Sequence, residues 1–213
     1  MTVRIKFCGM TSPADAELAA SLGVDAIGLV FVPGSRRAVD IALARQIIDA
    51  VPAFVNITAL FMDPEEEAIA RVMGELPVDL LQFHGSESPR GCEQLAQRYQ
   101  CRYIKALGVQ PADELRQQAS QYRGAAGILL DSHAPGAPGG TGRTADWQAL
   151  PTIEQRVILA GGLHAGNVAE AIATVRPFAV DVASGIESEP GMKDPQKMKS
   201  FVEEVRRVQQ TSE

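Results

Sequence analysis

Eight short apolar segments, each followed by a helical pattern, predict an α/β fold with a parallel eight-stranded core, the single-domain (β/α)8 or TIM barrel. Strict alternation of strands and helices is typical of parallel strands joined by right-handed crossovers. Eight such units favour closure into a barrel over an open sheet, and glycines recur where the segments end. No segment resembles an interdomain linker, so we expect one domain over residues 1–213.

The expected strands are apolar runs with little polar alternation, as in strands that are covered on both faces. They occupy residues 3–8, 26–31, 55–61, 79–83, 102–107, 128–130, 156–160 and 179–183.

Helices are expected between these strands, because aliphatic residues recur there at helical spacing and prolines stand near several starts. They begin near or include residues 13, 43, 64, 89, 111, 146, 168 and 195. Gly23 ends the first helix, the fifth ends near Tyr122, and the helix that begins near Asp146 is short.

The composition argues against several classes of protein. The net charge is -6 and basic residues form no cluster, which disfavours a nucleic-acid partner. No apolar run is long enough to span a membrane, and residues 1–10 contain no secretory signal. Three cysteines at unrelated spacings do not suggest a disulfide framework, and no CxxC or HExxH motif predicts a metal site. We therefore expect a soluble, reduced, cytoplasmic protein.

A carboxylate and a glycine-rich loop follow the sixth strand. Asp131 stands where the apolar run ends, and residues 135–142 are rich in proline and glycine. An acid at the carboxyl end of a parallel strand, followed by such a loop, lies where barrels of this kind place their chemistry. An aspartate that merely begins a turn is the alternative.

Cys8 closes the first strand and is followed by Gly9. Nearby N–H groups would lower the pKa of a thiol there, which would suit it to act as a base or nucleophile. Asp131 is expected across the barrel mouth, and two titratable groups that face each other over a substrate suit acid–base isomerisation. Cys92 in a helix and Cys101 before a strand are interpreted as structural.

Glycines after the last two strands match the usual phosphate site of these barrels, in which backbone N–H groups hold the anion. The candidate phosphate-binding residues are Gly161, Gly162, Ser184 and Gly185, with Gly140 and Gly142 contributed by the neighbouring loop.

Three further polar side chains are candidates with open alternatives, and two lysines are expected to be structural. Arg37 would hold a carboxylate in bidentate fashion or be a surface charge. His84 would donate to a ligand oxygen or serve the turn, and Asp181 would point into the barrel or towards the helices. Lys6, like Lys105, is expected inside the barrel as a structural charge.

Together these motifs resemble the phosphoribosylanthranilate isomerase family. The resemblance rests on KFCGMT at 6–11, FVPGSRR at 31–37, LQFHGSE at 81–87, LLDS at 129–132, GGTGRTADW at 139–147, LAGGL at 159–163, VDVASGIES at 180–188 and GMKD at 191–194. These motifs lie in order along nearly the whole chain. Phe7 departs from the aliphatic residue common in the family, at a position without a catalytic role.

The resemblance implies a cofactor-free enzyme of tryptophan biosynthesis. It would convert N-(5'-phosphoribosyl)anthranilate to 1-(o-carboxyphenylamino)-1-deoxyribulose 5-phosphate by an Amadori rearrangement. Cys8 then matches the general base and Asp131 the general acid. Arg37 matches the residue that positions the anthranilate, and the glycine loops match the phosphate site.

Two other functions remain open at this point. Indole-glycerol-phosphate synthase, another phosphosugar barrel, requires a lysine acid and glutamates where this chain offers Cys8 and Asp131. A non-catalytic phosphometabolite-binding barrel would retain the glycine loops without needing both residues. The partner is expected to be a small phosphorylated molecule, and the protein is expected to be a monomer or homodimer.

Overall fold

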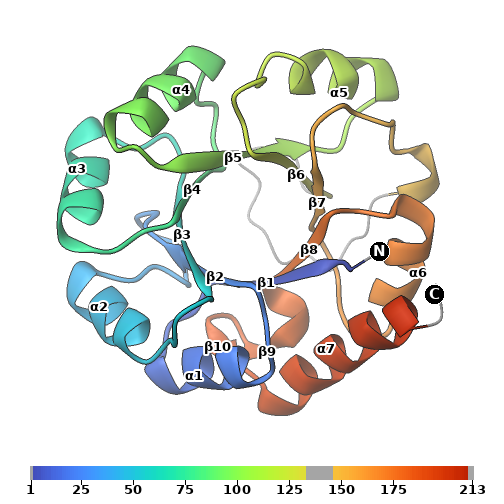
Figure 1. Cartoon of the computed structure of the whole chain (residues 1–213), viewed down its shortest axis with the longest axis horizontal. Coiled ribbons are helices and arrows are strands. Elements are labelled where there is room, and N and C mark those ends of the chain that lie inside the picture. Colours follow the sequence, from blue (N-terminus) through green and yellow to red (C-terminus); the bar gives the residue numbers. More distant parts are fainter. Residues whose placement is uncertain (1, 133–145, 211–213) are drawn as a thin grey trace.

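The computed structural model describes residues 2–132 and 146–210, and these form the expected barrel. Eight parallel strands close on themselves, and the helices surround them (Figure 1). The strands are β1 Arg4–Cys8, β2 Ala26–Val30, β3 Asn56–Phe61, β4 Leu80–Phe83, β5 Arg102–Gly108, β6 Gly127–Asp131, β7 Val157–Leu159 and β8 Ala179–Val182. Pairing of β8 with β1, with Lys6 beside Asp181, completes the ring.

The helices of the described residues are α1 Pro13–Ser21, α2 Ile41–Asp49, α3 Glu66–Glu75, α4 Pro89–Arg98, α5 Ala112–Ala119, α6 Val168–Val175 and α7 Pro195–Gln210. Two of them begin at the predicted prolines, Pro13 and Pro89, and each proline follows a serine that caps the helix. Ser12 Oγ accepts a hydrogen bond from the Asp15 amide at 3.2 Å, and Ser88 Oγ accepts one from the Gly91 amide at 3.1 Å.

Some predicted elements differ in the structure. The helix expected near Asp146 is a single 3-10 turn, η1 Trp147–Ala149, which Asp146 caps. The predicted third helix starts later, at Glu66, because the preceding residue, Glu65, still has an extended backbone with ψ 148°. A two-stranded hairpin of β9 Glu187–Glu189 and β10 Met192–Lys193 was not predicted. It follows a second 3-10 turn, η2 Ser184–Ile186.

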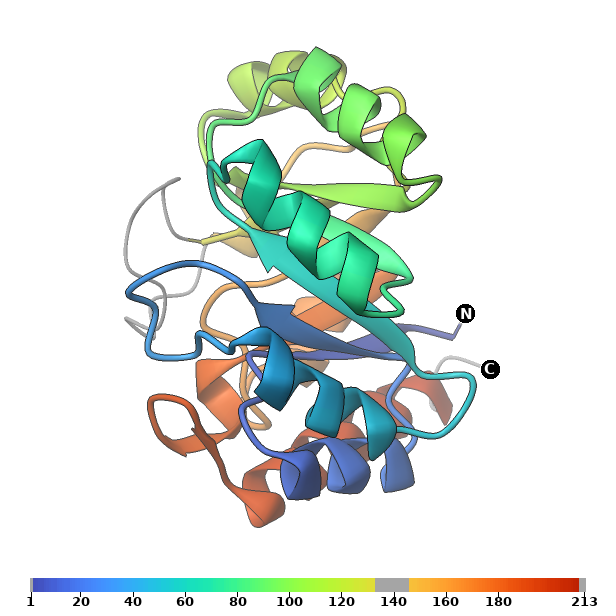
Figure 2. The same ribbon diagram turned by 90° about the vertical axis from the view of Figure 1, so that its left-hand side faces the viewer.

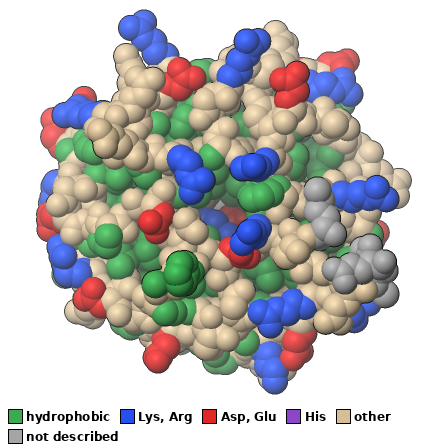
Figure 3. Space-filling view, in the orientation of Figure 1, with side chains coloured by type: hydrophobic (Ala, Val, Ile, Leu, Met, Phe, Trp, Pro, Cys, Tyr) green, Lys and Arg blue, Asp and Glu red, His purple; other side chains and the backbone are tan. Residues whose placement is uncertain are grey.

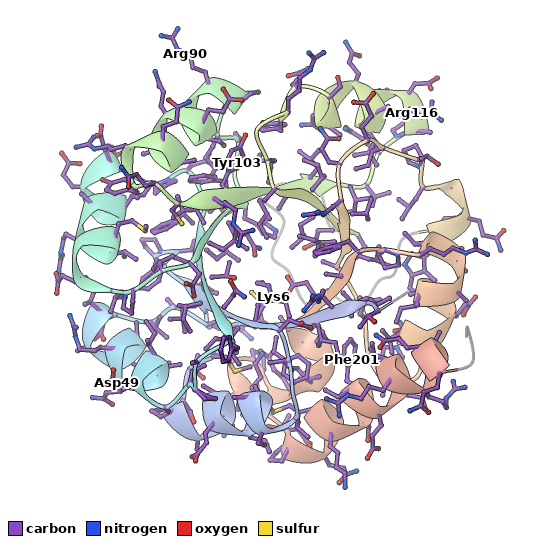
Figure 4. All side chains as sticks on the ribbon, in the orientation of Figure 1. Lys6, Asp49, Arg90, Tyr103, Arg116 and Phe201 are labelled. Atoms are coloured by element: carbon purple, nitrogen blue, oxygen red, sulfur yellow. The ribbon has the colours of Figure 1, made fainter. Side chains whose placement is uncertain are left out.

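The main hydrophobic core lies between the strands and the helices. Phe7 and Phe201 are fully buried there and meet edge to face, with ring centroids 6.0 Å apart, which joins β1 to α7. Figure 4 shows Phe201 on the inner side of α7 and Tyr103 between β5 and α4, whereas Asp49, Arg90 and Arg116 lie on the outer surface. A Phe7 side chain is therefore compatible with this packing.

The interior of the barrel is a separate and partly polar core. Ile104, Leu129 and Ile158 form an apolar cluster inside it, and Lys6, Thr58, Gln82 and Asp181 are buried as well. Lys6 lies close to the barrel axis (Figure 4). Lys105 was expected inside but points outward instead. Its Nζ contacts Glu87 Oε2 at 2.9 Å and lies over the Tyr122 ring, outside the barrel.

The two ends of the barrel differ in character. The hairpin and the loop between β2 and α2 lie on one side, and both chain termini lie on the other (Figure 2). Lys and Arg side chains gather around the barrel axis on the side where the strands begin (Figure 3). Phe54, which precedes β3 at that end, is fully exposed. Within the described residues, no helix has the length and apolar character needed to cross a membrane.

Candidate active site

The strands deliver the predicted site residues to one end of the barrel. Cys8 is the last residue of β1, Asp131 is the last residue of β6, and His84 directly follows β4. All three are shielded: Cys8 is 6% exposed, and the side chains of His84 and Asp131 are 27% and 16% exposed. The parallel topology thus brings together residues that are more than 40 positions apart in sequence.

Cys8 shares a small space with Lys6, above Gly28. Gly28 is the register partner of Cys8 on β2, and a Cβ added to it would lie 2.8 Å from Cys8 Sγ and 3.1 Å from Lys6 Nζ. Burial raises the pKa of the Cys8 thiol, and the Lys6 ammonium, Asp181 carboxylate and Lys193 ammonium modify it. The two ammonium groups lower this pKa and Asp181 raises it further, with a net increase. The thiol is therefore protonated at neutral pH in the resting protein.

Lys6 is held by Asp181, whose Oδ1 lies 2.9 Å from Lys6 Nζ. Both side chains are at most 7% exposed. Burial lowers the pKa of Lys6, but attraction to Asp181 and Cys8 outweighs this effect, and the net pKa is raised. Lys6 is therefore a cation beside the thiol. The two orientations left open for Asp181 are resolved, because its side chain lies inside the barrel.

His84 connects Asp131 to the barrel interior. His84 Nε2 lies 3.5 Å from Asp131 Oδ2, and His84 Nδ1 lies 3.2 Å from Gln82 Nε2. With the Gln82 amide as donor, Nδ1 accepts a hydrogen bond, and the neutral ring carries its proton on Nε2, facing Asp131. The sequence singled out His84 but not Gln82, because a glutamine within an apolar strand gives no chemical signal by itself.

Arg37 reaches the site from the loop after β2. Its Nε and Nη2 donate to Glu187 Oε1 and Oε2, both at 2.7 Å. Its side chain also lies against Gly9, whose φ of +72° and lack of a Cβ make room for it. Arg37 is therefore an ordered, half-buried cation rather than a solvated surface charge.

Glu187 and Lys193 are buried charged residues that the sequence analysis did not identify. Each is 6% exposed, and Lys193 Nζ lies 2.8 Å from Glu187 Oε1. They face each other across the hairpin, whose turn contains Pro190 and Gly191. This Pro-Gly pair was the available sequence signal, because such pairs mark tight turns.

The candidate phosphate loops pack against each other and against Asp131. Gly161 and Gly162 have positive φ angles of +81° and +67°, and a Cβ on Gly161 would lie 2.7 Å from Asp131 Oδ1. A Cβ on Gly185 would overlap the carbonyl oxygen of Leu163, so these two loops touch. Gly140 and Gly142 lie outside the described residues. No group of three or more possible metal ligands occurs among the residues that the structure describes.

The fold and the site define a (β/α)8-barrel protein whose polar groups converge at the carboxyl ends of its strands. Residues 5–204 match the family described as N-(5'phosphoribosyl)anthranilate (PRA) isomerase. The chain belongs to this family.

Relatives and solved structures resemble the chain over nearly its whole length. The N-(5'-phosphoribosyl)anthranilate isomerase of Acidithiobacillus ferrooxidans is 50% identical over 204 residues, which cover 96% of this chain and 98% of the relative. That of Azotobacter vinelandii is 48% identical over 205 residues, with coverage of 96% and 98%. The crystal structure of phosphoribosyl anthranilate isomerase from Thermotoga maritima superposes with a TM-score of 0.86 at 37% identity, covering 97% of this chain and 100% of that one. A further structure, at a TM-score of 0.83 and 35% identity, with coverage of 97% and 100%, is a complex with reduced 1-(o-carboxyphenylamino)-1-deoxyribulose 5-phosphate.

Proposed function

We propose that the protein catalyses the Amadori rearrangement of N-(5'-phosphoribosyl)anthranilate to 1-(o-carboxyphenylamino)-1-deoxyribulose 5-phosphate, in the tryptophan pathway of the cytoplasm and without a cofactor. The observation that carries this proposal is the placement of Cys8 and Asp131. They end two strands that are not neighbours, at one mouth of the barrel, and each has a polar partner beside it. The names of the relatives indicate the same reaction.

The proposed reaction needs one acid and one base. Protonated Asp131 donates to the ribose ring oxygen, and the ring opens to a protonated Schiff base. The Cys8 thiolate then takes the proton from C2 of the sugar, and the electrons of that C–H bond form the C1–C2 double bond of an enolamine. The C2 hydroxyl then gives its proton to the Asp131 carboxylate, and the Cys8 thiol delivers its newly gained proton to C1, which yields the ketone. Both groups regain the protonation they had before these transfers, so the overall change is an isomerisation.

The charges around Cys8 suit this role. The thiol is protonated in the resting site and must release that proton to water before it can act as the base. The positive charge of the Schiff base would favour this ionisation once the substrate ring has opened. Lys6 acts in the same direction from beneath the thiol. The Cys8 thiolate would therefore form next to the substrate once the Schiff base has made the C2 proton acidic.

The remaining contacts follow from the charges of the substrate. Arg37 would take the anthranilate carboxylate, and His84 and Asp181 would contact the sugar portion. Gly161, Gly162, Ser184 and Gly185 would hold the phosphate through backbone N–H groups, with Gly140 and Gly142 from the preceding loop. The contact of Gly161 with Asp131 supports this placement, because it puts the proposed phosphate loop next to the proposed acid.

Fluorescence-monitored turnover of freshly generated phosphoribosylanthranilate tests the proposal. Wild type should consume the substrate, and Cys8→Ser and Asp131→Asn should each lose about 100-fold or more in kcat with the fold retained. Cys92→Ser, which changes a buried thiol in α4 outside the barrel, is the matched control and should retain turnover. Absence of wild-type turnover, with phosphate still bound, would instead indicate a non-catalytic phosphometabolite-binding barrel. Turnover of indole-glycerol-phosphate synthase substrate would indicate that alternative enzyme.

The proposed state of assembly is a monomer or a homodimer. The Thermotoga maritima relative is described as dimeric. Light scattering at several protein concentrations distinguishes the two states for this chain.

A further inference from the structure

The hairpin of β9 and β10 carries two buried charges that the proposed proton transfers do not use. Glu187 and Lys193 are each 6% exposed, although both belong to a short hairpin at the barrel mouth. Burying charged side chains costs free energy unless each one is paired. The groups that pair with Glu187 and Lys193 therefore indicate which parts of the site the hairpin holds in place.

The first partner of Glu187 is Arg37. The carboxylate engages Nε and Nη2 of the guanidinium, at 2.7 Å each, with side-chain exposures of 17% for Arg37 and 4% for Glu187. This bidentate geometry fixes the plane and direction of the guanidinium. Nη1 makes no hydrogen bond within the described part of the chain, so Nη1 and the second N–H of Nη2 form the remaining edge of the guanidinium. One edge of Arg37 is thus anchored, and another is left for a carboxylate.

The second partner of Glu187 is Lys193, which extends the same network to Cys8. Lys193 Nζ lies 2.8 Å from Glu187 Oε1 and donates to the carbonyl oxygens of Cys8 at 2.7 Å and of Ala183 at 3.2 Å. The Glu187 carboxylate therefore contacts the side chain of Arg37 directly and is connected to the backbone of Cys8 through Lys193. These three side chains comprise two cations and one anion, and the Asp15 carboxylate lies beside Lys193 as a further negative charge.

The hairpin itself is firmly attached to the barrel. The Asp194 amide donates to the Ile186 carbonyl at 2.8 Å, and Lys197 Nζ donates to the Glu187 carbonyl at 2.7 Å. The Thr11 hydroxyl donates to the Gly191 carbonyl, which joins the turn of the hairpin to the loop after β1. The Glu187 carboxylate is thereby fixed with respect to β1.

We propose that Glu187 is a positioning residue, which orients Arg37 towards the carboxylate of the substrate and fixes it relative to Cys8. This inference rests on the proposed function, because it takes the substrate carboxylate as the ligand of Arg37. Glu187 itself does not touch the substrate. Its loss should weaken the recognition of that carboxylate and leave the proton transfers largely intact.

Kinetics of Glu187→Gln provide the test, with Glu189→Gln as the matched control because Glu189 is an exposed carboxylate on the same strand. We expect Glu187→Gln to raise KM about tenfold or more while kcat changes less than about threefold. Arg37→Ala should raise KM at least as much. In a protein that already carries Arg37→Ala, Glu187→Gln should raise KM little further, because the two residues act as one unit. Glu189→Gln should match wild type.

Ligand binding separates positioning from a general structural role. Glu187→Gln should weaken binding of reduced 1-(o-carboxyphenylamino)-1-deoxyribulose 5-phosphate about tenfold and leave binding of inorganic phosphate, which lacks the carboxylate, unchanged. Equal losses for both ligands, or an unchanged KM, would overturn the inference. If Glu187→Gln does not fold, Glu187→Asp takes its place, because the shorter side chain keeps the charge but cannot reach both cations.

The two proposals fail in different ways. If Arg37→Ala raises KM and Glu187→Gln does not, the positioning role is wrong and the proposed function stands. If wild type lacks isomerase activity, the proposed function is wrong.

Discussion

His84 Nε2 lies 3.5 Å from Asp131 Oδ2, although the two residues follow strands β4 and β6, which are separated by β5. The imidazole lies between the ends of these two strands, and its other nitrogen, Nδ1, contacts the amide nitrogen of Gln82 at 3.2 Å. Asp131 is therefore held between a directed N–H group and the glycine loop that contains Gly161.

Replacement of His84 by phenylalanine keeps a planar ring but removes the N–H group. We expect kcat to fall about ten- to a hundredfold, because the His84 N–H would stabilise the carboxylate that Asp131 becomes as it gives up its proton, and a hydrogen bond to a charged group contributes about 1.5–3 kcal/mol. KM should change much less. Steady-state kinetics check this, and a kcat within about twofold of wild type would show that Asp131 does not need His84.

The cation beneath Cys8 makes thiol reactivity a second test. Lys6→Met should raise the pKa of Cys8 further, because it removes a positive charge from direct contact with the sulfur. In this variant Asp181 would no longer be paired with Lys6. Lys193 and Arg37 would remain as the other charged groups near Cys8.

The rate of alkylation by iodoacetamide, followed against pH and assigned to Cys8 by peptide mass, reports that pKa. In wild type the rate should still be rising above the ordinary thiol value of about 8.5. Lys105→Met is the control, since it removes a buried lysine outside the barrel. If the alkylation rate had the same midpoint pH in wild type and in Lys6→Met, the assigned role of Lys6 would be contradicted.

Gly28 tests the space shared by the thiol and the ammonium. Gly28→Ala would place a methyl group 2.8 Å from Cys8 Sγ and 3.1 Å from Lys6 Nζ, so one or both must move. We expect kcat to fall about tenfold or more, because displacements of about 1 Å at reacting atoms are costly.

The matched control for this substitution is Gly74→Ala in α3, where an added Cβ meets nothing within 4 Å. That variant should keep full activity and gain about 0.5–1 kcal/mol of stability, since glycine is unfavourable inside helices. Turnover and urea unfolding of both variants measure the contrast. Equal activities of the two variants would mean that the space at Gly28 is not critical.

The order of elements could be predicted from the sequence because apolar runs and helical spacing are local properties. All eight barrel strands are confirmed. The direction of Lys105 was predicted wrongly, because a strand that is buried on both faces lacks the alternation that separates inside from outside. Lys6 and Lys105 look alike in sequence, but Lys6 lies inside the barrel, whereas the Nζ of Lys105 lies over the Tyr122 ring outside it.

The site could be predicted only in part. Cys8, His84 and Asp131 stand at strand ends, where parallel topology alone brings them together. Glu187 could not be found in this way, because its role depends on a bidentate contact with Arg37, 150 positions earlier. Its strand is only three residues long and mostly charged, so it gave no periodic signal.

The two proposed phosphate loops provide a further test at their point of contact. A Cβ on Gly185 would overlap the Leu163 carbonyl and lie 3.0 Å from His164 Cβ, which would force the loops after β7 and β8 apart. Gly185→Ala should therefore weaken binding of inorganic phosphate and raise KM, each about tenfold. Isothermal titration with phosphate measures this directly, and unchanged affinity would argue against a phosphate site at these loops.

The Glu187 carboxylate also predicts how stability depends on pH. Burial raises its pKa, but hydrogen bonds and attraction from Arg37 and Lys193 outweigh burial, so the pKa in the folded protein lies below its ordinary value. Such a group stabilises the fold above its unfolded pKa of about 4.3, and this contribution is lost as the pH falls through the lower, folded value. The difference in unfolding free energy between wild type and Glu187→Gln should therefore be constant between about pH 5 and 7 and should shrink below about pH 4. Urea unfolding of both proteins across this range measures the difference. If the difference in unfolding free energy were the same at about pH 3 as at pH 7, protonation of Glu187 would have removed no stability. The ionised carboxylate would then not be the source of the difference.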